Sequence, residues 1–120
     1  MAYKLRMEIV ETRVSNKQIT ALVDDEDYAE LQQALIHRPD LGDLIPGSGG
    51  LRKVRWVQRG RGKRDGIRVI YYWYDPEHMI YMLLAYAKNE QENLTQDQMK
   101  ILRKLIRREI RTWIRHCLTN

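Results

Sequence analysis

Three strand-like stretches lie close together in the middle of the chain, and they constrain its fold more than any other feature. They are LRKVRWVQ (51–58), GIRVIYYWY (66–74) and HMIYMLLAYA (78–87). The joins between them are short, a basic GRGKRD segment and a tight DPE turn. Strands joined in this way pair most easily as antiparallel neighbours. We therefore expect a three-stranded meander at the centre of the fold.

The segments on either side of the meander predict the remaining elements. Residues 3–12 alternate between apolar and polar and predict a strand, whereas 15–22 is ambiguous and compatible with a short helix opened by Ser15. Residues 24–38 predict a helix capped by Asp24 or Asp25, followed by a glycine-rich connector up to residue 50.

The last quarter of the chain predicts a long amphipathic helix. Apolar residues recur there at helical spacing, and Thr95 with Gln98 forms a capping-box pattern at its start. Together the elements predict an α+β fold: a small twisted, mainly antiparallel sheet of about four strands, with N-terminal helices and a long C-terminal helix packed on it. A length of 120 residues suits a single domain, 1–120.

The charge balance favours a polyanionic partner. Lys and Arg number 21 against 16 Asp and Glu, which gives a net charge of +5. Nucleic acid, an acidic protein or an anionic membrane surface would each suit such an excess.

The cysteine count and the apolar runs indicate where the protein is located. The single cysteine excludes an intramolecular disulfide, and no apolar run reaches the roughly 20 residues of a membrane span. The chain opens like a strand and not like a secretory signal. We expect a cytoplasmic protein.

The positive charge is concentrated in and between the first two strands of the meander. The cations of this segment are opposed only by Asp65; they are Arg52, Lys53, Arg55, Arg59, Arg61, Lys63, Arg64 and Arg68. Because side chains alternate along a strand, Lys53 and Arg55 should share one face while Val54 and Trp56 occupy the other. A solvated strand face that resists aggregation is the simpler explanation. The number of cations and the excess of Arg over Lys instead favour a phosphate site, with RNA as the partner.

Other chemistry has little support in the sequence. The glycines of the basic segment do not have the spacing of a dinucleotide or P-loop motif, and the histidines are scattered. No cluster suggests a metal site, and we expect neither metal nor cofactor. A second basic set on the predicted C-terminal helix is interpreted mainly as a solvated face.

Three blocks of the sequence, taken in order, resemble a known family. The blocks LGDLIPGSGGLRKVRW, GRGKRDGIRVIYYW and LLAYAKNEQENLTQDQ are similar to those of HigB/RelE-type toxins of bacterial type II toxin–antitoxin modules, and most similar to the HigB branch of the RelE/ParE superfamily. The resemblance implies a ribosome-dependent mRNA endonuclease (an mRNA interferase) that inhibits translation. It also implies two partners, a cognate antitoxin and the 70S ribosome with mRNA in the decoding site. Such enzymes cleave RNA with Lys and Arg side chains and without metal.

The resemblance assigns roles to individual residues. Lys53 becomes the candidate base, because neighbouring positive charges favour loss of its proton, and Arg68 would stabilise the phosphate. The implied catalytic set is Lys53, Arg55, Arg64, Arg68 and Lys88. The implied RNA-binding set is Arg52, Arg59, Arg61, Lys63, Tyr86 and Asn89.

The chain departs from the family pattern at a few positions. Asn89 stands where some relatives have Arg, and Asp65 replaces a common glycine. The base-stacking tyrosine that some relatives carry near the C-terminus is also missing, because no tyrosine follows Tyr86. Two alternatives therefore stay open: a gyrase-inhibiting, ParE-like toxin on the same scaffold, and a non-catalytic RNA-binding or degenerate toxin module. The clustered cations favour the nuclease.

Overall fold

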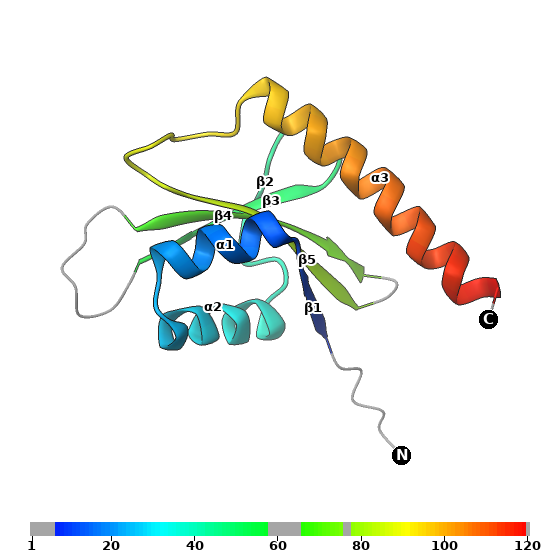
Figure 1. Cartoon of the computed structure of the whole chain (residues 1–120), viewed down its shortest axis with the longest axis horizontal. Coiled ribbons are helices and arrows are strands. Elements are labelled where there is room, and N and C mark those ends of the chain that lie inside the picture. The colour runs from blue at the N-terminus through cyan, green and yellow to red at the C-terminus, as the bar shows by residue number, and fades with distance from the viewer. Residues whose placement is uncertain (1–6, 58–65, 76–77, 120) are drawn as a thin grey trace, which may run out of the picture.

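A five-stranded sheet with three helices makes up the fold (Figure 1). The computed structural model describes residues 7–57, 66–75 and 78–119, and side chains as far as residue 108. The elements in chain order are β1 (Glu8–Glu11), α1 (Arg13–Leu22), α2 (Asp25–His37), β2 (Asp43–Leu44), β3 (Leu51–Trp56), β4 (Ile67–Tyr74), β5 (Met79–Ala87) and α3 (Gln96–Thr119).

The sheet is mixed but mostly antiparallel, which confirms the predicted α+β class. Its order is β1-β5-β4-β3-β2; β1 runs parallel to β5, and every other pair is antiparallel. The predicted meander is therefore β3-β4-β5. The fifth strand is β2, which lies inside the segment expected to be only a connector.

The glycine-rich segment after β2 is a tightly bonded hairpin loop. The amide of Ile45 donates to the carbonyl of Leu51 at 2.8 Å, and the Ser48 hydroxyl donates to the carbonyl of Ile45 at 2.6 Å. The same hydroxyl accepts the amide of Leu51 at 3.0 Å, so the buried Ser48 holds the start of β3 in place.

The N-terminal helices begin at polar caps, and one cap differs from the prediction. Asp24 caps α2 as predicted, because its carboxylate accepts the amide of Asp27 at 2.9 Å. In α1 the cap is Thr12 and not Ser15; the Thr12 hydroxyl accepts the amide of Ser15 at 3.0 Å. Ser15 is buried one turn into the helix, so its choice as the opening residue was wrong.

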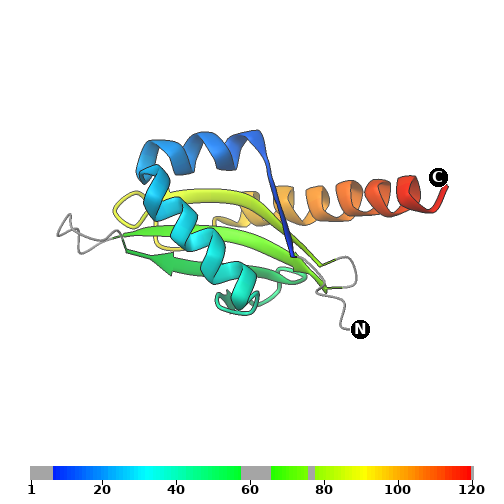
Figure 2. The ribbon, with the colours of Figure 1, turned by 90° about the horizontal axis from the view of Figure 1, so that it is seen from below.

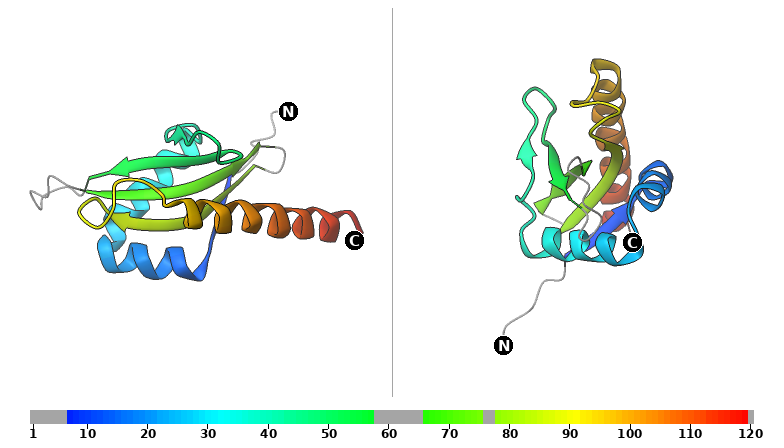
Figure 3. Two further views of the ribbon diagram at one scale, coloured as in Figure 1. Left: turned by 90° about the horizontal axis from the view of Figure 1, so that it is seen from above. Right: turned by 90° about the vertical axis from the view of Figure 1, so that its left-hand side faces the viewer.

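The sheet is covered on both faces (Figures 2 and 3). On one face α1 and α2 pack on a core cluster that includes Ile19, Leu31, Val54, Val69 and Tyr71. On the other face the first half of α3 packs on a second cluster, which includes Leu51, Ile70, Leu83, Tyr86 and Leu102. Figure 2 shows the later part of α3 extending past the end of the sheet. Within the described ranges, no helix has the length and apolar character needed to cross a bilayer.

Where β1 ends, side chains from the cap and the body of α1 form hydrogen bonds with backbone groups of β5. The Thr12 hydroxyl donates to the carbonyl of Leu83 at 3.2 Å, and the amide of Ala85 donates to the Gln18 side chain at 2.8 Å. Close to this point the pairing of β4 with β5 shifts register, and Leu83 and Leu84 both join the cluster under α3. This irregularity brings Tyr86 onto the same face as the charged residues of β3.

Candidate nucleic-acid interface

Three cations of β3 and β4 share the face of the sheet that is opposite to α1 and α2. In the register of the sheet, Arg55 of β3 lies opposite Arg68 of β4, and Arg68 lies opposite Tyr86 of β5. Lys53 lies on the same face of β3, two residues from Arg55, whereas Val54 is buried in the core under α1 and α2. The predicted orientation of Lys53 and Arg55 is therefore confirmed. We call Lys53, Arg55 and Arg68 the cation cluster.

All members of the cation cluster contact the loop that joins β5 to α3, residues 88–95. One carboxylate oxygen of Glu92, Oε1, lies 3.6 Å from Nη2 of Arg68 and 3.8 Å from Nη2 of Arg55. The next residue, Asn93, accepts a hydrogen bond from Nζ of Lys53 at 2.9 Å. Two successive loop residues thus bring the three cations together.

Arg68 and Arg55 differ sharply in burial. The side chain of Arg68 is 5% exposed, whereas that of Arg55 is 65% exposed. A guanidinium keeps its charge in proteins, so it cannot escape the cost of burial by losing its proton. A buried arginine held by the sheet is a fixed positive charge in a poorly hydrated place, where it interacts strongly with an anion.

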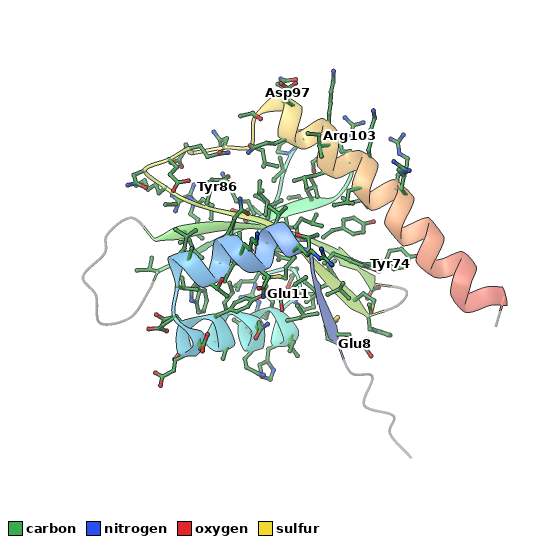
Figure 4. The ribbon with its side chains drawn as sticks, in the orientation of Figure 1. Glu8, Glu11, Tyr74, Tyr86, Asp97 and Arg103 are labelled. Carbon is green, nitrogen blue, oxygen red and sulfur yellow. The ribbon has the colours of Figure 1, made fainter. Side chains whose placement is uncertain are left out.

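Tyr86 lies under this loop and not on an open surface. It is 4% exposed, and its hydroxyl donates to the backbone carbonyl of Glu92 at 3.5 Å. Figure 4 labels it beside the segment that leads to α3. Burial raises the pKa of the Tyr86 phenol above its usual value, while the nearby charge of Arg68 partly opposes this rise. In this conformation its ring has little surface on which a base could stack.

Arg52 belongs to a different environment from the cation cluster. It pairs with Tyr71, which lies in the core under α1 and α2. Its Nη1 donates to the carbonyl of Gly42 at 2.8 Å, and its guanidinium carbon lies 5.9 Å from the ring centre of Trp73. The structure thus places Arg52 on the opposite face of the sheet from the cation cluster and gives it a role in holding the segment before β2.

Two further predicted residues, Lys88 and Asn89, lie in the loop 88–95. Lys88 and Asn89 are exposed at the start of the loop 88–95, and the amide of Lys88 donates to the carbonyl of Gly66 at 3.4 Å. Four predicted residues lie outside the described part of the chain: Arg59, Arg61, Lys63 and Arg64. Among the described residues, no group of three His, Cys, Asp or Glu side chains could hold a metal ion.

The sequence reasoning missed Glu92 and Asn93. The segment KNEQEN reads as an ordinary polar connector, and nothing in its pattern indicates that two of its side chains reach back to β3 and β4. Their pairing with Arg68 and Lys53 depends on the path of the loop over the sheet. Only the weak signal of an acidic residue near a strongly basic face was available.

Comparison with known proteins identifies the family and the fold. A family model described as the RelE toxin of the RelE/RelB toxin–antitoxin system matches residues 29–112. A solved structure of an arginine-to-alanine double mutant of E. coli toxin RelE, in the free state, superposes with a TM-score of 0.53 at 12% sequence identity. The match covers 72% of this chain and 88% of that one, and at this identity it shows a shared fold. The matched segment of the family model includes β3, β4, β5 and the whole cation cluster, and the chain belongs to the RelE toxin family.

Proposed function

We propose that this protein is a ribosome-dependent mRNA endonuclease of the HigB branch, acting in the cytoplasm as a single RelE-like domain of residues 1–120. The observation that carries the proposal is the cation cluster: Lys53, Arg55 and Arg68 meet at one place on a rigid sheet, and one of them is buried. Membership of the RelE toxin family supports the same conclusion.

The cluster has the groups that metal-free RNA cleavage needs. The 2′-hydroxyl attacks the adjacent phosphorus, negative charge builds up on the phosphate oxygens, and the 5′-oxygen leaves. Arg55 and Arg68 would stabilise that charge through forked N–H donors held in advance by the sheet. Lys53 would move a proton as base or acid. Lys88 and Arg64 are the further candidates for phosphate contact or for protonating the leaving oxygen.

The partners follow from the same proposal. The family pairs each toxin with an antitoxin, and a basic surface suits an acidic partner segment. The 70S ribosome would supply the mRNA, splayed in the decoding site where its bases and backbone can be reached. Neither metal nor cofactor takes part in the chemistry.

A brief induction experiment tests the function. The chain is expressed for minutes in a bacterium, mRNA 5′ ends are mapped by primer extension, and plasmid topoisomers are run in parallel. We expect new 5′ ends at codon-phased positions. Relaxed or cleaved plasmid would instead favour a gyrase-inhibiting toxin, and the absence of both effects would favour a non-catalytic module.

Arg68 gives the sharpest single-residue test. Arg68→Ala should abolish killing and cleavage, because it removes the buried positive charge. Since that change also empties a buried site, Arg68→Lys is the companion variant: it keeps the charge but loses the fork, and we expect about a 100-fold loss of cleavage rate. Circular dichroism checks that both variants fold, and full toxicity in either folded variant would remove Arg68 from the site.

A further inference from the structure

The anion that faces the cation cluster belongs to the chain itself. We propose that the Glu92 carboxylate occupies the place of an RNA phosphate between Arg55 and Arg68, and that RNA must displace it to bind. This inference rests on the proposed function, because it takes an RNA phosphate as the natural occupant of the site.

One carboxylate oxygen of Glu92 lies between two guanidinium groups, in the place where we expect a phosphate oxygen to bind. The same atom, Oε1, faces Nη2 of both arginines, at 3.6 Å from Arg68 and 3.8 Å from Arg55. Both distances exceed the roughly 2.7–2.9 Å of a direct charge-assisted hydrogen bond. The carboxylate is therefore held by charge more than by close contact. An RNA phosphate is not tethered to the loop 88–95, so it can make the shorter contacts that Glu92 does not make.

The exposed fractions show how an incoming phosphate would meet this group. The side chains of Glu92 and Arg55 are 51% and 65% exposed, whereas Arg68 is 5% exposed. A phosphate arriving from solvent thus meets Arg55 and the carboxylate before it meets Arg68. Replacement of one anion by the other leaves the charge around the buried guanidinium balanced, so Arg68 need not lose its counter-charge during binding.

The loop 88–95 has contacts that can be exchanged at low cost. Glu92 is otherwise linked to the sheet by the long hydrogen bond from the hydroxyl of Tyr86 to its carbonyl, and Asn93 by its bond from Lys53. The Lys53 bond and the Arg55 ion pair lie between exposed groups, and such contacts contribute little to stability. The pair with the buried Arg68 is stronger, but a phosphate in the same place would restore it. At the end of the loop, Thr95 and Gln98 fix the start of α3. Displacement of Glu92 would also uncover Tyr86, the residue predicted to stack on a base.

Binding of a non-cleavable RNA tests the proposal without any need for catalysis. The probe is a short fluorescein-labelled 2′-O-methyl RNA, and its affinity is measured by fluorescence anisotropy. Glu92→Gln keeps the shape of the side chain and removes the competing charge. Glu90→Gln is the matched control, because Glu90 is exposed in the same loop and forms no ion pair with another described residue. We expect Glu92→Gln to bind about fivefold more tightly than the wild type and Glu90→Gln to change affinity by less than about twofold.

Other outcomes would overturn the proposal. If Glu92→Gln binds as the wild type does or more weakly, Glu92 does not compete with the phosphate and instead orients the arginines. An equal gain in Glu90→Gln would show only a general effect of charge. Arg55→Ala separates this failure from failure of the proposed function: weaker binding in Arg55→Ala with no gain in Glu92→Gln rejects the role of Glu92 alone, whereas unchanged binding in Arg55→Ala rejects the phosphate site itself.

Discussion

Arg55 and Arg68 lie opposite each other on adjacent strands, yet they should behave differently when replaced. Both face Oε1 of Glu92, but only Arg55 is largely in solvent. A change at Arg55 therefore tests the chemistry with little effect on the fold, because substitutions of exposed side chains usually alter stability by less than about 0.5 kcal/mol.

The chain contains a closely matched control for Arg55. Arg38 forms an ion pair with Asp40 at 3.9 Å with side-chain exposures of 67% and 59%, compared with 65% and 51% for Arg55 and Glu92. We expect Arg55→Ala to lower the rate of mRNA cleavage on ribosomes about 100-fold, through loss of charge stabilisation in the transition state. Arg38→Ala should cleave at the wild-type rate, and both should melt like the wild type. Equal cleavage by the two variants would contradict a catalytic role for Arg55.

At the scale of single residues, the sequence predicted on which face of the sheet Lys53 and Arg55 lie, but it did not predict which side chains of the site are buried. The period of a strand was enough to place Lys53 and Arg55 on the face away from Val54, and the structure confirms it. The burial of Tyr86 and Arg68 depends on a loop and a helix that arrive later in the chain. No local pattern carries that information.

At the scale of elements, the start of α3 is held by a reciprocal cap. The amide of Gln98 donates to the hydroxyl of Thr95 at 3.0 Å, and the amide of Thr95 donates to the side chain of Gln98 at 3.0 Å. The side chain of Gln91 also donates to Gln98 at 2.9 Å, so the cap extends into the loop 88–95. The capping-box prediction is confirmed, and the cap is part of what positions Glu92.

Loss of this cap should have a measurable cost. We expect Thr95→Ala to lower the free energy of unfolding by about 1 kcal/mol, because the amide of Gln98 loses its partner. Thr20→Ala is the control: Thr20 is exposed within α1, and its hydroxyl donates to the carbonyls of Asn16 and Lys17 in the preceding turn of its own helix. That variant should stay within about 0.5 kcal/mol of the wild type. Urea denaturation measures both, and an equal effect of the two changes would show that Thr95 does not act as a cap.

Gly66 lies directly before β4 and two residues before Arg68. Its φ is +59°, and a Cβ there would lie 2.5 Å from the backbone oxygen of Trp56. Gly47 also has a positive φ, +72°, but a Cβ there would meet nothing within 4 Å. A substitution at Gly47 therefore tests backbone strain alone, whereas the same substitution at Gly66 adds a collision with the backbone of the neighbouring strand.

Alanine at these two positions should have unequal effects. Gly47→Ala is expected to cost about 1 kcal/mol of unfolding free energy, the price of a left-handed conformation. Gly66→Ala should cost at least about 3 kcal/mol, because the backbone of β3 must also move. Urea denaturation again gives both values. Similar losses in the two variants would mean that β3 and β4 adjust freely at this end.

Elements that depend on their neighbours were the ones the sequence could not predict. β2 is only Asp43–Leu44, and it is a strand because the Ser48 loop folds it against β3. The register shift in β5 likewise depends on distant residues, because Thr12 and Gln18 near the start of the chain form hydrogen bonds with the backbone of Leu83 and Ala85. The long periodic elements β4, β5 and α3 were predicted close to their observed bounds, since their own side chains determine which face is buried.

At the scale of the whole molecule, two groups of cations among the described residues lie on different elements. The cation cluster lies on the sheet, while exposed cations at Lys100, Arg103, Lys104 and Arg107 follow α3. Figure 4 shows Arg103 projecting from α3 away from the sheet. Net charge alone would attract RNA to both surfaces, so the proposed function requires that the sheet, and not the helix, makes the phosphate contacts.

Salt dependence distinguishes the two surfaces, because each phosphate contact to single-stranded RNA contributes about 0.7 to the slope of log affinity against log salt. Two double variants are compared, and each removes one Lys and one Arg. The sheet variant combines Lys53→Gln with Arg55→Gln, and the α3 variant combines Lys100→Gln with Arg103→Gln. Titration of the 2′-O-methyl RNA probe at several KCl concentrations gives the slope for each. We expect the sheet variant to lose about 1.4 from the wild-type slope and the α3 variant to keep it. If the slope falls by the same amount in both variants, RNA binds to the whole basic surface, and the cation cluster is not a specific phosphate site.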